Sequence, residues 1–439
     1  MPERFALSCK WLNRKGDTPF DRAFAASINI SVDGRSLTRL FSELDNEVRN
    51  DMRGCAWQLA QWFAANWWRL RWEAHATQTQ RNNVDWGMSH CVASAGGGFI
   101  WPDIVFDSDG ESIGISLSPD KNPPPYQPVQ YLNEENTYVP AEEFERSVDN
   151  YLSAVIARGT LKKDAHDGSL KALWDEVLNE RRDPDASRYR KWEAIAGYGP
   201  DEAPKALMAW ILKASQRYGQ SASEEVAAQA RHESVEAFEA LQKVSKRSGV
   251  IVSMPVLTDD GTVRGCAGEL PWQKAEQLAR SARREWGLGS APVSEKQLAG
   301  LVGASGDEFF GSRVAKVSMP FLLRDGRKEE ARLFLPRKPA TSRRFAVSRL
   351  IGDNLYADGQ DRLLPATNAQ TIRQKFQRAF AQAFLCPFDA LQDKLGTDVP
   401  DDDDIADAAD YFKVSPLLVR TVLVNKGMLG RGMLNQQAG

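Results

Sequence analysis

Histidine is rare in this sequence, which has four copies among 439 residues. His75, His90, His166 and His232 lie far apart, and no two have the i,i+4 spacing that places a pair of metal ligands on one face of a helix. Zinc enzymes rely mainly on histidine and cysteine ligands. The shortage of histidine therefore disfavours a zinc enzyme.

Cysteine and long apolar runs are also scarce. Because the cysteines are odd in number and scattered, we expect reduced side chains with structural roles, and neither a disulfide framework nor a zinc site. No run of 18 apolar residues occurs, and the first residues lack the apolar stretch of a secretory signal. We therefore expect a cytoplasmic protein that does not associate with a membrane. The cysteines are Cys9, Cys55, Cys91, Cys266 and Cys386.

The charges are nearly balanced, with 56 basic and 59 acidic residues and a formal net charge of −3. This balance disfavours a surface devoted to nucleic acid, although a local basic patch stays open. Hydrophobic residues make up 42% of the chain, which is typical of globular proteins and excludes a disordered class. The length predicts about two or three domains.

The sequence patterns predict a multidomain α+β protein. We expect a tryptophan-rich α/β domain over residues 1–135, a helical region over 136–250 and a mostly helical domain with a small β-hairpin or sheet over 251–439. In the first domain, Asp33-Gly34 marks a hairpin and a long helix is predicted over about 40–73. In the last domain, two helices are predicted over about 341–356 and 368–385.

Tryptophan is concentrated near the start, where Trp67, Trp68 and Trp72 alternate with Arg69 and Arg71. One interpretation is a stacking platform for single-stranded nucleic acid, supported by the basic segment 179–192. The other is a buried helix face, with the two arginines on the solvent side. We favour the buried face, since Trp67 lies on the apolar stripe of the predicted helix.

Two further motifs suggest chemistry. His90 and Cys91 are adjacent, but neighbours on a strand point to opposite faces, so they cannot form a catalytic dyad there. The glycines at 96–98 lack the Lys-Ser/Thr of a phosphate loop and indicate a hinge or bulge. His232 and Glu236 share a face of a predicted helix and could ligate one metal, but we favour an ordinary charged helix face as their explanation.

The two predicted helices near the end carry a resemblance. RRFAVSRLIGDNL (343–355) is followed by QKFQRAFAQAFLCPFDAL (374–391), and the pair resembles the zincin-like domain of the ImmA/IrrE family. In that family the first helix reads roughly R-F-x-x-A-H-E-x-G-H and the second E-A-x-x-F-A-x-x-L-L-x-P. Arg344-Phe345, Gly352, Phe380-Ala381 and Pro387 fit this frame, and the resemblance covers about residues 268–430. It implies a zincin-like fold.

The catalytic positions of the family are changed. By the resemblance, Arg349 replaces the first metal histidine, Leu350 the general-base glutamate, Asp353 the second histidine and Phe376 the third ligand. A zinc hydrolase needs three protein ligands and a base. We therefore expect no catalytic residue, no metal and no other cofactor here. Arg349 and Asp353 are at i,i+4, so we expect them to pair with each other.

These observations lead to three functional hypotheses. The first is a non-catalytic pseudo-metallopeptidase that acts as a protein-interaction or regulatory subunit, with a partner protein encoded nearby. The resemblance implies a bacterial stress-response, mobile-element or phage-defence setting. The second is an active metal-dependent peptidase with relocated ligands, drawn from Asp353, His232 and Glu236. The third is a single-stranded nucleic-acid-binding module built on Trp67, Trp68, Arg69, Arg71 and Trp72.

Overall fold

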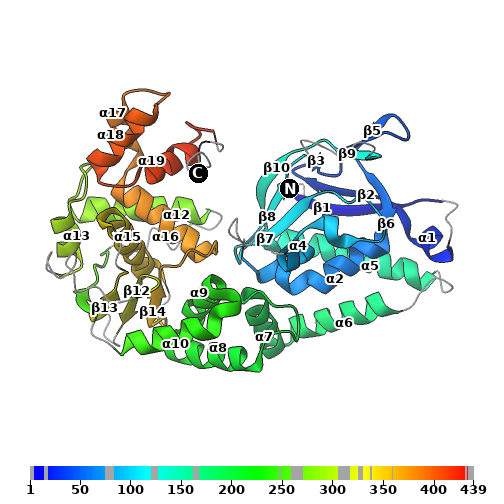
Figure 1. The fold of residues 1–439 in the computed structure, drawn as a ribbon, viewed down its shortest axis with the longest axis horizontal. Helices are drawn as coiled ribbons and strands as arrows, with labels where there is room; N and C mark the ends of the chain where they lie inside the picture. Colours follow the sequence, from blue (N-terminus) through cyan, green and yellow to red (C-terminus); the bar gives the residue numbers. More distant parts are fainter. Residues whose placement is uncertain are drawn as a thin grey trace. The chain divides into compact units, whose positions relative to one another are not determined.

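A computed structural model gives the fold of the chain (Figure 1). It divides into two compact units, Met1–Met208 and Ala209–Gly439, and the division falls within helix α8 (Lys205–Tyr218) of the segment that we predict to be helical. The protein is a mixed α+β protein with small antiparallel sheets. The described residues are 4–13, 18–74, 84–119, 127–161, 168–246, 249–258, 270–304, 317–324, 330–336, 339–357, 359–430 and 433.

The described residues of unit 1 form three small sheets. The first joins β1 (Phe5–Trp11), β2 (Ala25–Val32), β3 (Arg35–Ser36) and β6 (Met52–Cys55). The others are β5 (Glu47–Arg49), β4 (Leu40–Ser42) and β9 (Val129–Tyr131), and β10 (Glu135–Pro140), β8 (Ser112–Leu117) and β7 (Ile104–Ser108). The predicted β2–β3 hairpin is confirmed, because Asp33 and Gly34 both have positive φ, as a tight hairpin turn requires.

The long helix predicted over 40–73 is wrong in its first half. Residues 40–55 form the short strands β4, β5 and β6, and helix α2 (Ala56–Trp72) begins only at Ala56. In β4, buried and half-buried residues alternate, and Leu40 pairs with Tyr131, which lies far along the chain. Because that pairing is long-range, local spacing did not predict it.

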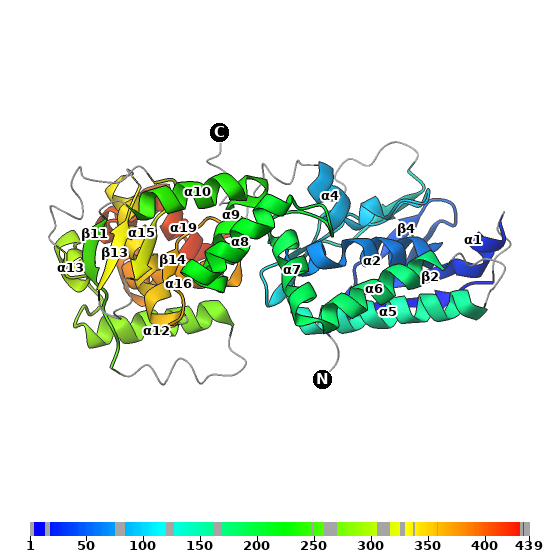
Figure 2. The same cartoon turned by 90° about the horizontal axis from the view of Figure 1, so that it is seen from below.

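The core of unit 1 forms where α2 packs on α5 (Ala141–Leu161) and α6 (Ser169–Arg182), as Figures 1 and 2 show. Trp67 lies against Phe144 and Trp174 within this core. Other helical segments among the described residues of unit 1 are α1 (Pro19–Phe24), α4 (Val84–His90), η1 (Val92–Ala95) and α7 (Pro184–Ile195). Among the described helices of the chain, none has the length and hydrophobicity needed to span a bilayer.

The helix that we predict to carry both His232 and Glu236 is interrupted. Helix α9 (Gln220–Ala230) ends at Arg231, which has a φ of 48°, and the 3₁₀ turn η3 (Arg231–Glu233) leads into α10 (Ser234–Ser245). A left-handed residue cannot continue an α-helix, so α9 stops before His232. His232 lies in the 3₁₀ turn and Glu236 in α10, and the two are not held at i,i+4 on one continuous α-helix.

Unit 2 is built on one four-stranded sheet and the helices that pack around it. The antiparallel strand order is β11 (Val250–Ser253), β13 (Glu330–Phe334), β12 (Phe321–Arg324) and β14 (Leu363–Pro365). Helices α15 (Ala340–Tyr356) and α16 (Ile372–Leu385) confirm the two predicted helices, and α12 (Pro271–Glu285) packs on α16. Its described part also contains the helices α13 (Glu295–Leu301), α17 (Phe388–Leu395), α18 (Asp402–Phe412) and α19 (Pro416–Asn425).

Helices α15 and α16 approach closely at Gly352. A Cβ atom at this position would lie 2.5 Å from Cγ of Phe380 on α16, well inside van der Waals contact. Phe380 is fully buried in the core of unit 2, so its ring has no space into which to move. Gly352 therefore sets the distance between α15 and α16.

We predict that Gly352→Ala destabilises unit 2 by about 1–3 kcal/mol, because the added methyl group overpacks the α15–α16 contact. Gly300→Ala is the matched control, since Gly300 is also helical but has open space around its Cβ position. There the better helix propensity of alanine should stabilise the unit by up to about 1 kcal/mol. Hydrogen exchange of peptides from α15 and α16 measures the stability of unit 2 alone. If both substitutions changed this stability equally, the close contact at Gly352 would be contradicted.

Candidate functional site

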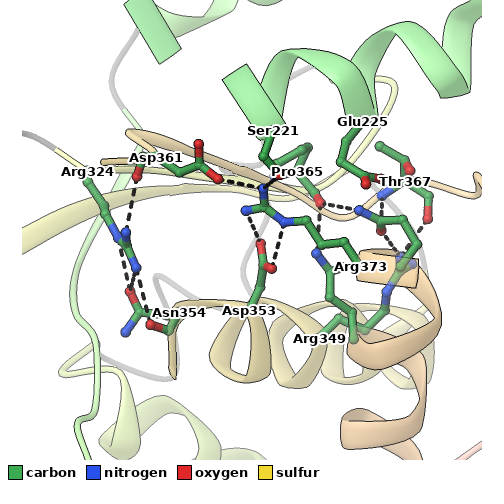
Figure 3. Close-up of polar contacts among 12 residues, drawn as sticks. Ser221, Glu225, Arg324, Arg349, Asp353, Asn354, Asp361, Pro365, Thr367 and Arg373 are labelled. Carbon is green, nitrogen blue, oxygen red and sulfur yellow. Dashed lines mark hydrogen bonds and ion pairs between the residues drawn. The ribbon is translucent and has the colours of Figure 1, made fainter. Parts of the chain in front are cut away.

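The facing sides of α15 and α16 carry a buried ion network centred on Arg373 (Figure 3). Its Nε and Nη2 atoms donate to the two carboxylate oxygens of Asp353, each at 2.9 Å, and Nη1 donates to Asp361 at 2.7 Å. Nη1 also donates to the hydroxyl of Ser221 on α9 at 3.0 Å. The fork of one guanidinium group thus joins α16, α15, α9 and the loop before β14.

A second guanidinium group lies beside this network with different partners. Nη2 of Arg349 donates to the carbonyl oxygen of Thr367 and to Oε1 of Gln374, both at 2.5 Å. Gln374 is itself fixed, since its Oε1 accepts from the Thr367 amide and its Nε2 donates to the carbonyl of Pro365. The partners of Arg349 are therefore neutral.

Helix α9 supplies a further buried charge. Glu225 is buried and accepts a hydrogen bond from the hydroxyl of Thr371 at 2.7 Å. Burial raises the pKa of its carboxyl group, although the nearby Arg373 guanidinium opposes this shift. At the other end of the network, Arg324 donates to the side chain and carbonyl oxygens of Asn354 and to the carbonyl of Asp361.

Two of our expectations for the family positions need correction. Arg349 and Asp353 are both buried, but the ion partner of Asp353 is Arg373, not Arg349. The residues of α16 that meet them are Arg373 and Gln374, whereas Phe376 packs into the core with its ring 4.0 Å from that of Tyr356. Leu350 is also buried in that core.

These side chains do not suit a metal ion. The carboxylate of Asp353 already accepts two hydrogen bonds from a permanent cation, and the guanidinium group of Arg349 cannot act as a ligand. His232 and Glu236 are exposed on η3 and α10. Within the described ranges, no three histidine, cysteine or acidic side chains gather in a way that could hold a metal.

A groove with a cavity volume of about 910 Å³ opens beside Arg349 within unit 2. Its lining includes the basic side chains of Arg343 and Arg349 from α15 and Arg378 from α16. It also includes the acidic side chains of Glu233 and Glu236 from η3 and α10. The other lining residues are neutral polar and apolar, and the apolar ones include Val226, Leu241, Phe345, Leu417 and Leu418.

The tryptophan and arginine run of unit 1 is mostly buried. Trp67 and Trp68 lie in the core, and Nε1 of Trp68 donates to Glu180, so neither indole is placed to stack on a nucleotide. Trp72 is half-buried, and the cations of Arg71 and Lys191 both lie close to its ring. Our expectation that both arginines mark the solvent side is wrong for Arg69, which is buried.

Arg69 belongs to a buried polar cluster. It pairs with Glu73 at 2.6 Å and with Asp85 at 2.9 Å, while His90 contacts the same Glu73 oxygen through Nε2 at 3.0 Å. His90 ends helix α4 and does not lie on a strand as we expected, whereas the thiol of Cys91 donates to Asp103. The two neighbours therefore have separate partners and form no dyad.

The basic segment 179–192 is largely paired with acidic residues of unit 1. Arg181 contacts Glu145 and Asp149, and Arg190 contacts Glu180, Glu193 and Asp201. Charges neutralised in this way are poorly available to a phosphate backbone. The tryptophan and basic side chains that suggested a nucleic-acid-binding module are thus mostly engaged in contacts within unit 1.

Sequence reasoning did not single out Arg373, Gln374, Asp361 or Glu225. A polar residue at the start of a helix ordinarily faces solvent, so Arg373 gave no signal of its own. The signal that could have indicated it is the presence of two charged residues, Arg349 and Asp353, on the inward face of α15. Buried charged side chains require polar partners, and the next helix can supply them.

We predict that Asp353→Asn destabilises unit 2 by about 3–5 kcal/mol, since it leaves a buried guanidinium group without half of its counter-charge. Glu239→Gln is the control, because it breaks a solvent-exposed i,i+4 pair with Lys243 and should cost less than about 1 kcal/mol. Urea unfolding followed by hydrogen exchange in α15 and α16 measures both. If both substitutions lowered the free energy of unfolding by similarly small amounts, the Arg373 network would contribute little to the stability of unit 2.

We also predict that Glu225→Gln makes unit 2 more stable than the wild type near neutral pH. The raised pKa means that the folded state bears the cost of the buried charge once both states are ionised. As the pH falls through the folded-state pKa, the folded wild type takes up a proton first and the advantage of the variant decreases. Urea midpoints across a pH series measure this difference, and an advantage that grows on acidification would contradict it.

Comparison with known proteins adds no relative: the chain matches no family model, no curated protein and no solved structure.

Proposed function

We propose that this protein is a non-catalytic binding protein and that unit 2 is a degenerate relative of the ImmA/IrrE metallopeptidases. The observation that carries the proposal is the Arg373 network between α15 and α16. By the resemblance, α15 is the helix that would carry two metal ligands and the base. In this chain its Arg349 and Asp353 bond instead to side chains of α16.

The groove beside this network supports a binding role. Its volume of about 910 Å³ lies at the upper end of the range of about 300–1,000 Å³ that is usual for ligand sites. It combines an apolar lining with charged groups at defined places, which suits recognition of a protein segment. We propose a partner protein encoded nearby and a regulatory role in a bacterial stress-response, mobile-element or phage-defence system, as the resemblance implies.

The alternative of an active peptidase with relocated ligands has less support. It needs His232 and Glu236 to act with Asp353, yet His232 lies in the 3₁₀ turn η3 whereas Glu236 lies in α10, and Asp353 is occupied by Arg373. The nucleic-acid alternative needs Trp67 and Trp68, whose indoles are buried.

The proposal predicts that the purified chain contains well below one zinc ion per molecule and captures a specific protein through the groove. Metal content is measured by mass spectrometry. A photo-crosslinking amino acid replaces Leu417, which is 57% exposed in the groove lining, in the native host. The control position is Val399, which is 84% exposed and does not line the groove.

We expect one protein to be cross-linked from position 417 and not from 399. Stoichiometric zinc that disappears in Asp353→Asn would contradict the non-catalytic assignment. Equal cross-linking from both positions would contradict recognition through the groove.

A further inference from the structure

The charge of Arg349 is not balanced where it lies. Its side chain is buried, with 6% of the residue exposed, and it lines the groove of unit 2. Its hydrogen bonds go to two neutral oxygens, and its Nε atom is buried without a hydrogen-bond partner. Among the residues that the structure describes, no carboxylate lies within ion-pairing distance of it.

Such a cation is costly to keep, because burial removes the water that would solvate it. Burial and the nearby Arg378 lower the pKa of Arg349 to about 9, so the group remains charged at neutral pH. Asp353 and Glu225 offset part of this cost, but each is already bonded elsewhere, to Arg373 and Thr371. An anionic group entering the groove would supply the missing counter-charge.

The other residues that line the groove indicate which chemical class of ligand it suits. Glu233 and Glu236 also line the groove and can pair with a cationic group of a ligand. The apolar side chains of Val226, Leu241 and Phe345 in the same lining favour contact with hydrophobic groups. The groove therefore suits a ligand that combines an anionic group, apolar groups and a cation.

We propose that the groove binds an extended peptide segment of a partner protein, with an acidic side chain paired with Arg349 and a basic side chain facing Glu233 and Glu236. This inference rests on the proposed binding function and specifies the chemistry of its partner.

The test uses random 12-residue peptides displayed on phage and selected against the full chain. Enriched sequences are synthesised with a fluorescent label, and their binding is measured by fluorescence anisotropy. We expect them to share an acidic residue, a basic residue and apolar ones. Arg349→Gln should weaken binding at least about tenfold, because it removes one partner of a buried ion pair. Arg284→Gln on the exposed part of α12 is the matched control and should leave binding unchanged.

Substitution of the acidic residue in the peptide by its amide tests the same contact without altering the protein. It should weaken binding to the wild type and have little further effect on Arg349→Gln, as expected for directly interacting groups. Because the amide-substituted peptide is measured against the wild-type protein, it still tests the ion pair if Arg349→Gln fails to fold. Among the acidic lining residues, Glu236→Lys should weaken peptides that carry a basic residue and tighten peptides in which that residue is acidic.

The proposal is overturned if the enriched peptides lack an acidic residue or if the amide substitution has no effect. It is also overturned if magnesium-ATP or an oligothymidylate displaces the peptide competitively, because the groove would then take a phosphate. If Arg349→Gln leaves the cross-link from position 417 intact, the partner binds without this ion pair, and only the present inference fails. If peptides bind as described but no cellular protein is cross-linked, the proposed function fails instead.

Discussion

The contact on which unit 2 most depends is the fork of hydrogen bonds made by Arg373. It joins α16 to Asp353 on α15, to Asp361 in the loop before β14 and to Ser221 on α9. These segments are separated by up to 152 positions in the sequence, so their mutual placement cannot come from local structure. Apolar packing brings the helices together, but the guanidinium fork specifies their register, since its geometry satisfies only one arrangement of oxygen atoms.

A metal ion and this guanidinium group can fulfil the same structural task. Each gathers oxygen or nitrogen atoms from separate elements around a positive centre, and each excludes water from the space it fills. The difference lies in chemistry, because a guanidinium group offers no open coordination position and cannot activate water. On the proposed relationship, unit 2 has kept the organising charge between its helices and exchanged a reactive centre for an inert one.

Some features of unit 2 could be predicted from the sequence because they are local. The spacing of apolar residues such as Val347, Ile351, Phe380 and Phe384 predicted α15 and α16, and the structure buries all four of these side chains. The partner of Asp353 could not be predicted in this way. Arg349 lies one turn away on the same helix, but the side chain that meets Asp353 comes from the next helix. That choice depends on how two helices pack, which periodicity does not encode.

Unit 1 shows the same limit. The buried helix face that we favoured for the five tryptophans between 57 and 72 is confirmed, since most of them fill the core around α2, but other features of unit 1 were missed. The strands between 40 and 55 escaped prediction because their pairing partners include residues near 131. Arg231 carries no sequence signal for a left-handed conformation, since only glycine and asparagine adopt it readily.

The tight fixation of Gln374 has a consequence for kinetics. Its amide is held by Thr367 and Pro365, and it in turn holds Arg349, so the guanidinium group is already immobilised before any partner arrives. The rotamer entropy of a long side chain, which an exposed arginine would lose on association, has been lost during folding. We therefore expect a partner to bind this preorganised cation without rearrangement of Arg349. Different partners should differ mainly in their dissociation rates.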